Sequence, residues 1–319
     1  MIKSILHSQS PIVKLFFLLV LSIGGLSVFL FFAALMMKLI WGISFLSDPS
    51  VLENLSDPYI VDANRFMLIF QHIGFFILPS LVFLYVGTKD PRNFILWKRQ
   101  FQFSTLFIVV GILLFLAPFV NLLISWNEAM HLPDFLSSVE ANMRLMEDSA
   151  GRLTDALVSM NTPNELIYMI FIVAVLPAIG EELMFRGIVQ RLLSQQFKSY
   201  HIGIWITALL FSALHFQFFG FFPRVFLGAV LGYLLIFSGN IIYPMIAHFF
   251  NNFSSLVLAY MIQHKIIGDE IETIGGQQEW LYILPGLIVS GLLFYFLWRK
   301  RSVSIGQEYI ERNYIEGAL

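Results

Sequence analysis

The stretch IYMIFIVAVLPAIGEELMFR, residues 167–186, decides how this chain is interpreted, because it sets two adjacent glutamates and an arginine in apolar sequence. A helix that spans a bilayer needs about 20 mainly apolar residues, and this stretch has that length. A charged side chain at the centre of such a helix costs roughly 2.5–3.5 kcal/mol on insertion scales. We therefore expect Glu181, Glu182 and Arg186 to be paired, protonated or used in a functional site.

The composition of the whole chain is that of a membrane protein. Of its 319 residues, 58% are hydrophobic and 13% are charged, whereas soluble domains have roughly 45–50% and about 25%. We expect an all-α, multi-pass protein of a bacterial inner membrane that contacts membrane lipids. The net charge of −2 gives no reason to expect a nucleic-acid partner, and the absence of cysteine excludes cysteine-ligated metals.

Apolar runs predict a polytopic bundle of about eight transmembrane helices. The predicted spans are 13–37, 65–87, 104–125, 165–189, 203–219, 223–238, 241–261 and 280–298. They divide one integral membrane domain into N-terminal helices (1–164), a central core (165–261), and a last helix with a cytoplasmic tail (262–319).

Charged residues in alternate loops predict the orientation of the bundle. One set of loops is basic and contains Lys89, Arg92, Lys98, Arg99, Arg186, Arg191, Lys198, Arg299, Lys300 and Arg301. The opposite loops are acidic or neutral and contain Asp48, Glu53, Asp57, Asp269, Glu270 and Glu272. By the positive-inside rule, both termini lie in the cytoplasm.

The longest connection on the predicted outer side covers residues 126–163. Apolar residues such as Phe135, Val139 and Leu153 recur there at roughly helical spacing. This pattern predicts one or two amphipathic helices that lie on the membrane surface or cap the bundle, and a solvated polar loop is the alternative. The tetrapeptide TPNE at 162–165 is typical of a capping box that begins the next helix.

The two glutamates are expected to differ. Glu182 and Arg186 are four residues apart with the acid nearer the N-terminus, which is the favourable order for a helical ion pair. Such a pair leaves Glu181, about 100° around the helix, as an unpaired carboxylate suited to general-base chemistry. The alternative is a salt-bridged helix end at the cytoplasmic interface, with both glutamates in water.

Two later apolar segments contribute further polar groups. The motif FSALH sets His215 in the predicted fifth span, and HFFNN sets His248 and Asn252 on one helix face in the seventh. At about 1.5 Å per residue, these side chains and Glu181 fall at similar depths near the middle of the membrane. A lone histidine in an apolar helix is more often a core residue, and His72 is assigned no role on that ground.

This set of groups indicates hydrolysis by an activated water. A carboxylate and a neutral histidine can deprotonate a bound water, with or without Zn²⁺, while His248 and Asn252 could donate hydrogen bonds to an oxyanion. Serine chemistry is less well supported, because Ser212 has no nucleophile elbow or acidic third member beside it. The HExxH zinc pattern does not occur.

At these residues the chain resembles the CPBP intramembrane proteases, a family that includes the CAAX prenyl endopeptidase and bacterial Abi or bacteriocin-immunity proteins. The family pattern is EExxxR, FxxxH and HxxxN on successive membrane helices. The matching residues here are Glu181-Glu182…Arg186, Phe211…His215 and His248…Asn252. The resemblance covers about 165–255, and the three motifs together are strongly specific.

The resemblance implies a catalytic core at 165–261, with a mid-membrane cavity open to the cytoplasm. It implies that Glu181 and His215 activate the hydrolytic water and that His248 and Asn252 form the oxyanion site. The expected substrate is a peptide or a lipidated protein that enters from the membrane or the cytoplasm.

The supporting residues and the metal are also implied by the resemblance. Glu182 and Arg186 are expected to support the catalytic groups. Family members are described both as metalloproteases and as glutamate proteases; if zinc is required, its ligands here would be Glu181, His215 and His248. Two histidines and no cysteine argue against an obligatory zinc.

Two sequence features predict how the helices pack. The small-residue pattern from Gly228 to Gly232 should let the sixth span approach the fifth and seventh closely. Pro177 should kink the fourth span and free backbone carbonyls near Glu181.

Two other classes of function remain open on the sequence. One is a non-catalytic immunity or scaffold protein that keeps the motifs and acts by binding. The other is a proton-coupled transporter, since carboxylates and histidines at mid-membrane also form proton relays; the lack of repeat symmetry between the halves argues against it.

Overall fold

All regular secondary structure is helical in the part of the chain that the computed structural model describes, residues 6–97, 100–268, 279–300 and 309–310. Within it, seven helices are long and apolar enough to cross a membrane: Pro11–Trp41, Pro58–Gly87, Phe103–Glu128, Pro163–Phe197, Phe221–Ser238, Ile242–Gln263 and Trp280–Lys300. The chain is therefore an integral, multi-pass membrane protein, as its composition predicts. The orientation stays a prediction, and Lys98, Arg99, Asp269, Glu270, Glu272 and Arg301 lie outside the described residues.

Two of the spans contain π-helical turns. The second span consists of α3 (Pro58–His72), the π-helical turn η2 (Ile73–Ile77) and α4 (Leu78–Gly87). The fourth consists of α8 (Pro163–Met169), η4 (Ile170–Val175), α9 (Leu176–Glu182), η5 (Leu183–Val189) and α10 (Gln190–Phe197). The remaining helices are α2 (Pro11–Trp41), α5 (Pro91–Phe94), α6 (Phe103–Glu128), α7 (Ser137–Val158), α11 (Tyr200–Ala213), α12 (Phe221–Ser238), α13 (Ile242–Gln263) and α14 (Trp280–Lys300).

The predicted C-terminal end of the fifth span, at residue 219, is wrong. Helix α11 ends at Ala213 after 14 residues, roughly 21 Å of helix, which is shorter than the hydrocarbon core of about 30 Å. His215 lies in the turn that follows, and Phe216 has a left-handed backbone with φ 53°. The chain therefore reverses within residues 214–220 and returns as α12.

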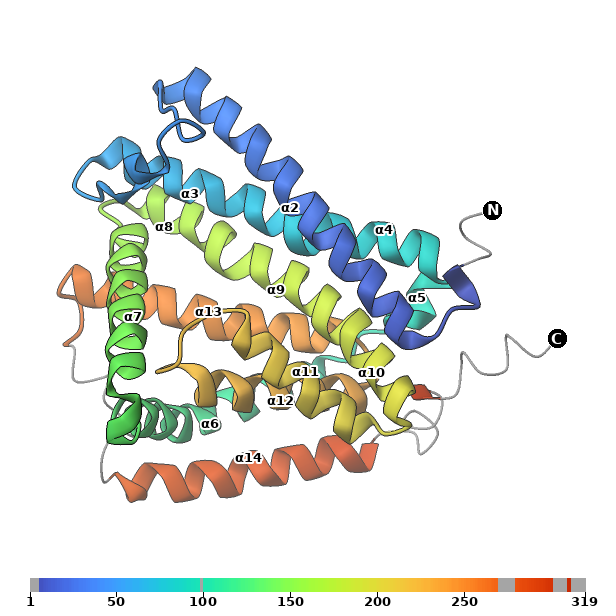
Figure 1. Cartoon of the computed structure of the whole chain (residues 1–319). Coiled ribbons are helices and arrows are strands. Elements are labelled where there is room, and N and C mark those ends of the chain that lie inside the picture. Colours follow the sequence, from blue (N-terminus) through green and yellow to red (C-terminus); the bar gives the residue numbers. More distant parts are fainter. Residues whose placement is uncertain (1–5, 98–99, 269–278, 301–308, 311–319) are drawn as a thin grey trace.

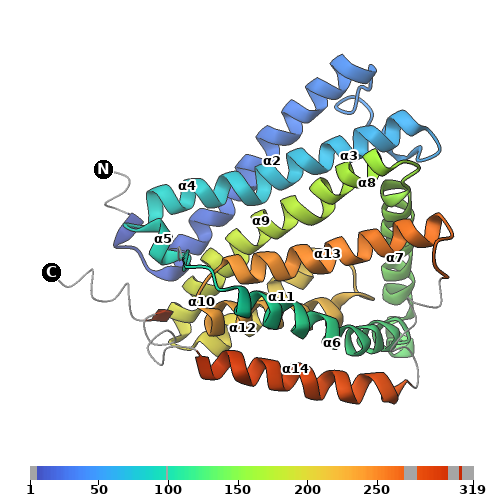
Figure 2. The same cartoon turned by 180° about the vertical axis from the view of Figure 1, so that it is seen from behind.

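The connection 126–163 contains the predicted amphipathic helix, α7. Figures 1 and 2 show α7 running across the ends of the bundle, on the side opposite α5 and α10. The predicted N-cap at Thr162 is confirmed, because Thr162 Oγ1 accepts a hydrogen bond from Glu165 N at 3.3 Å. The return bond of Glu165 Oε2 comes from Asn161 N at 3.1 Å, one residue before the N-cap, and not from Thr162 N as in a capping box.

Helix α7 fixes the turn that carries His215. The backbone N–H of Phe219 donates to Glu147 Oε2 at 3.3 Å, and the Arg144 guanidinium lies 4.2 Å from the centre of the Phe219 ring. Arg144 is itself held by Glu140 at 2.8 Å. The Leu132 N–H and then the side chains of Arg144 and His131 lower the pKa of Glu140 to about 2, so this carboxylate stays ionised at neutral pH.

The glycines of α12 permit the close approach to α11 that the sequence predicts, and they also lie against the fourth span, whereas α13 is not among their nearest neighbours. A methyl group on Gly228 would lie 3.2 Å from Ala208 of α11, and one on Gly232 would lie 2.7 Å from Gln190 Oε1. The carbonyl oxygens of these two glycines accept hydrogen bonds from side chains of the fourth span. Gly228 O accepts from Arg186 Nη2 at 3.1 Å, and Gly232 O accepts from Gln190 Nε2 at 3.3 Å.

Helix α2 crosses the second span at a pair of glycines. A methyl group on Gly25 would overlap with the carbonyl oxygen of Gly74, and one on Gly74 would lie 2.6 Å from Cβ of Phe29. Close crossings of this kind need small residues at the point of contact. The crossing fixes η2, which begins directly after His72.

We expect Gly25→Ala to lower the thermal unfolding midpoint of the purified protein in detergent. The added methyl group pushes α2 away from η2, and overpacking of this kind costs about 1–3 kcal/mol. The matched control is Gly24→Ala, since nothing lies within 4 Å of a methyl group at that position. Equal midpoints for the two variants would show that α2 and η2 do not meet at these glycines.

Candidate active site

Pro177 shapes the helix that carries the two glutamates. Proline has no backbone N–H, so the carbonyl four residues earlier, at Val173, cannot receive its usual helical hydrogen bond. The helix is π-helical there, and Asn252 Nδ2 from α13 donates to Val173 O at 2.9 Å. This carbonyl, two helical turns before Glu181, therefore holds Asn252. The kink predicted at Pro177 stays a prediction.

Glu182 and Arg186 form the ion pair that their spacing predicts. Arg186 Nη1 donates to Glu182 Oε1 at 2.8 Å, and neither side chain has any exposed surface. The guanidinium also lies 4.7 Å from the centre of the Phe211 ring. The alternative of a hydrated helix end with two wet glutamates is therefore wrong.

The same carboxylate oxygen of Glu182 also holds His248. Nδ1 of His248 lies 2.8 Å from Glu182 Oε1. Because a carboxylate only accepts hydrogen bonds, Nδ1 carries the proton, and Nε2 is the atom that faces Glu181. Glu182 therefore orients a histidine from another span in addition to pairing with Arg186.

Glu181 lies outside that ion pair, as predicted, and its two oxygens face histidines from two other helices. His248 Nε2 lies 3.9 Å from Glu181 Oε2, and His72 Nε2 lies 3.4 Å from Oε1. His215 is connected to this cluster through Phe211, whose carbonyl oxygen and ring it contacts. The ring of Phe211 lies next to both His215 and His248, with centroid distances of 5.1 and 6.1 Å.

His215 and Asn252 are each held in one orientation. Nδ1 of His215 donates to Phe211 O at 2.9 Å, so a neutral ring presents Nε2 as an acceptor, and this side chain is exposed. Asn252 Oδ1 accepts from Asn251 Nδ2 at 3.2 Å. The amide of Asn252 has one N–H beyond the bond to Val173 O.

His72 is the member of this cluster that the sequence did not indicate. It is the last residue of α3, and the turn η2 that follows packs on Gly180, where a methyl group would lie 3.1 Å from Phe76 and 3.0 Å from Ile77. The contact with Glu181 depends on which helix η2 packs against. The sequence of the second span alone carries no signal for it.

Comparison with known proteins identifies the segment that contains the three motifs. Residues 163–254 match the family model described as type II CAAX prenyl endopeptidase Rce1-like. This segment is similar to the Rce1-like prenyl endopeptidases. The family resemblance seen in the motifs is thereby confirmed for this segment.

Part of the chain is also similar to a curated protein. The chain is 34% identical over 103 residues to the uncharacterized protein YpbD of Bacillus subtilis (strain 168). The aligned part is 31% of this chain and 48% of that protein, so the chain spans about half the length of this relative. No solved structure matches the chain.

The residues expected to bind zinc lie in the Rce1-like segment 163–254. A tetrahedral zinc needs donors about 2.0–2.3 Å from one point. Among the residues described, no group of three or more His, Cys, Asp or Glu side chains is arranged to hold a metal ion. The expected ligands Glu181, His215 and His248 do not form such a group, so the reaction proposed for this chain uses only its own side chains.

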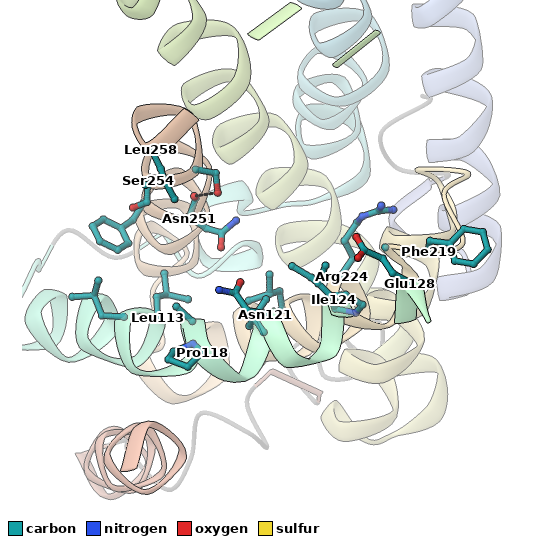
Figure 3. Close-up of a pocket in the computed structure, with 18 of the residues that line it drawn as sticks. Leu113, Pro118, Asn121, Ile124, Glu128, Phe219, Arg224, Asn251, Ser254 and Leu258 are labelled. Atoms are coloured by element: carbon teal, nitrogen blue, oxygen red, sulfur yellow. Dashed lines mark hydrogen bonds between the residues drawn. The ribbon is translucent and has the colours of Figure 1, made fainter. Parts of the chain in front are cut away.

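A cavity of about 820 Å³ lies between α6, α7, α12 and α13 (Figure 3). Leu113, Pro118 and Leu258 give it apolar wall, and Asn251 also lines it. Its charged lining residues are Glu128, Arg144, Glu147, Asp148 and Arg224. Because Asn251 donates to Asn252 Oδ1, it connects the cavity to the predicted oxyanion site. The expected opening toward the cytoplasm stays a prediction.

We expect Arg186→Met to destabilise the protein by about 3–5 kcal/mol, because it leaves the Glu182 carboxylate charged and buried without its partner. The effect is measured as a lower thermal unfolding midpoint or a loss of folded protein after detergent extraction. Arg152→Met on the exposed part of α7 is the control and should change stability by less than about 0.5 kcal/mol. A wild-type midpoint for Arg186→Met would contradict the role of this ion pair.

Proposed function

We propose that this chain is an intramembrane endopeptidase whose catalytic residues are Glu181, His215, His248 and Asn252. The observation that carries the proposal is a buried carboxylate with two histidine ring nitrogens within 4 Å, inside apolar helices. Ionisable groups at membrane depth are expensive and are typical of functional sites. The match to prenyl endopeptidases supports the class of reaction.

The first step of the proposed reaction is attack by water. Glu181 removes a proton from a water molecule as the water oxygen attacks the carbonyl carbon of the peptide bond. His215 accepts a hydrogen bond from the same water through Nε2, since its Nδ1–H is engaged by Phe211 O. The product of this step is a tetrahedral intermediate with a negative oxygen.

The second step is collapse of that intermediate. His248, whose Nδ1 is held by Glu182 Oε1, directs Nε2 into the site and donates from Nε2–H to the oxyanion. Asn252 donates with its remaining N–H. Glu181 returns its proton to the amide nitrogen as the C–N bond breaks. This gives a carboxylic acid and a free amine, which become a carboxylate and an ammonium group by proton transfer between them, and it leaves the enzyme unchanged.

The substrate in this proposal is a lipidated or membrane-tethered peptide. The apolar wall that α6 and α13 give the cavity, with Leu113, Pro118 and Leu258, suits the lipid part of such a substrate, and Asn251 of this cavity donates to Asn252 Oδ1. The basic loops support an orientation with both termini in the cytoplasm, and we propose a bacterial inner membrane as the location.

Peptidase activity is tested with purified protein in liposomes and a fluorogenic peptide, offered with and without a prenyl group. Glu181→Gln should lower kcat by about 10²–10⁴-fold, the usual contribution of a general base, and His215→Ala should also abolish most turnover.

The control for this assay is Asp155→Asn on the exposed surface of α7, which should keep wild-type activity. Activity should also persist in the presence of a metal chelator. A wild-type rate of peptide cleavage in Glu181→Gln would contradict the protease assignment. The binding and transport functions would then be tested by ligand capture and by proton flux.

The role of the cavity is tested by filling it. Ala117 lines the cavity from α6, and Ala117→Trp should raise KM for the prenylated peptide at least about tenfold more than for the unmodified peptide, since it competes with the apolar group. Gly291→Trp on α14 adds a similar bulk where nothing lies within 4 Å and should leave both values unchanged. Equal changes in KM for the two peptides would exclude this cavity as the lipid site.

A further inference from the structure

One contact to Glu181 comes from outside the Rce1-like segment 163–254. His72 is 109 residues away from Glu181 in the chain, and its Nε2 lies 3.4 Å from Glu181 Oε1. The contact from His248 to the other oxygen is longer, at 3.9 Å. Of these two histidines, His72 therefore makes the closer contact with the carboxylate that the proposed reaction uses.

The ring of His72 is held rigidly. Its Nδ1 lies 3.0 Å from the carbonyl oxygen of Leu68, one helical turn earlier, and its ring packs on Phe76 with centroids 5.5 Å apart. The side chain is 17% exposed. A ring fixed in this way presents Nε2 in one direction, toward Glu181.

The hydrogen-bond partners of the two ring nitrogens show that Nε2 of His72 is the atom that holds Glu181. A carbonyl oxygen only accepts, so Nδ1 of His72 carries a hydrogen, and the bond between Nε2 and Glu181 Oε1 needs one further hydrogen between those two atoms. That bond fixes Oε1. The second oxygen, Oε2, is then the one presented to His248 and to the water.

We propose that His72 is a positioning residue of the endopeptidase, which holds Oε1 of Glu181 so that Oε2 meets the attacking water. The inference rests on the proposed function. A glutamate has several rotatable bonds, and misplacing a reacting group by about 1 Å can cost about 10²-fold in rate. The second span would thereby complete a site whose motifs lie in the fourth, fifth and seventh.

The test compares three substitutions at this position by steady-state kinetics on the membrane-tethered peptide. His72→Phe keeps the ring but has no polar atom. His72→Asn can still donate to Leu68 O, but its amide stops short of Glu181. His72→Gln carries an amide N–H at the reach of Nε2 and can hold Oε1.

We expect His72→Phe and His72→Asn to lower kcat by about 10–100-fold with KM within about twofold of wild type, because the substrate still binds while its base is misplaced. His72→Gln should recover kcat to within about fivefold of wild type. The thermal unfolding midpoints of all three variants are measured on the same samples.

The outcomes separate this inference from the proposed function. Three variants with wild-type kcat, beside an inactive Glu181→Gln, would overturn the role of His72 and leave the endopeptidase standing. If all three variants lose kcat equally and also unfold at lower temperatures than wild type, His72 has a structural role alone. That result would also overturn the inference. A wild-type protein that cleaves no peptide would overturn the proposed function itself, and the inference with it.

Discussion

The geometry of the site depends on a single carboxylate oxygen, Glu182 Oε1, which accepts from both Arg186 and His248 at 2.8 Å. The surroundings are apolar and exclude water, and charge-assisted hydrogen bonds are strong under such conditions. Glu182 is thereby committed to Arg186 and to Nδ1 of His248, while its neighbour Glu181 faces Nε2 of His248 and Nε2 of His72. Two adjacent residues of the same type thus acquire different surroundings, which is the arrangement that separates a structural acid from a reactive one.

The irregular helix of the fourth span serves the same geometry. Helix α9, which carries both glutamates, lies between the π-helical turns η4 and η5, and such turns are frequent at functional sites. Pro177 removes one backbone donor, and the carbonyl of Val173 accepts from Asn252 in its place. A regular helix would have occupied that carbonyl, and α13 would have lost a point of attachment beside His248.

Local spacing allowed much of this site to be predicted from the sequence. The ion pair of Glu182 and Arg186 follows from a separation of four residues, and the amphipathic helix α7 follows from its periodicity. The end of α11 could not be predicted, because the phenylalanines that follow His215 are as apolar as a membrane span while the chain turns at Phe216. The contact between His72 and Glu181 could not be predicted either, since it depends on the tertiary packing of η2 against Gly180.

The Rce1-like segment is therefore only part of the site's architecture. The turn that carries His215 is bound from outside that segment by Glu147 of α7 and by Asn127 of α6, whose side chain donates to Phe218 O at 3.1 Å and accepts from Phe222 N at 3.0 Å. His72 adds a third contact from the N-terminal half. A division of the sequence at residue 164 separates the motifs from the groups that orient them, so the helices that lack any motif determine how accurately the motif residues can meet.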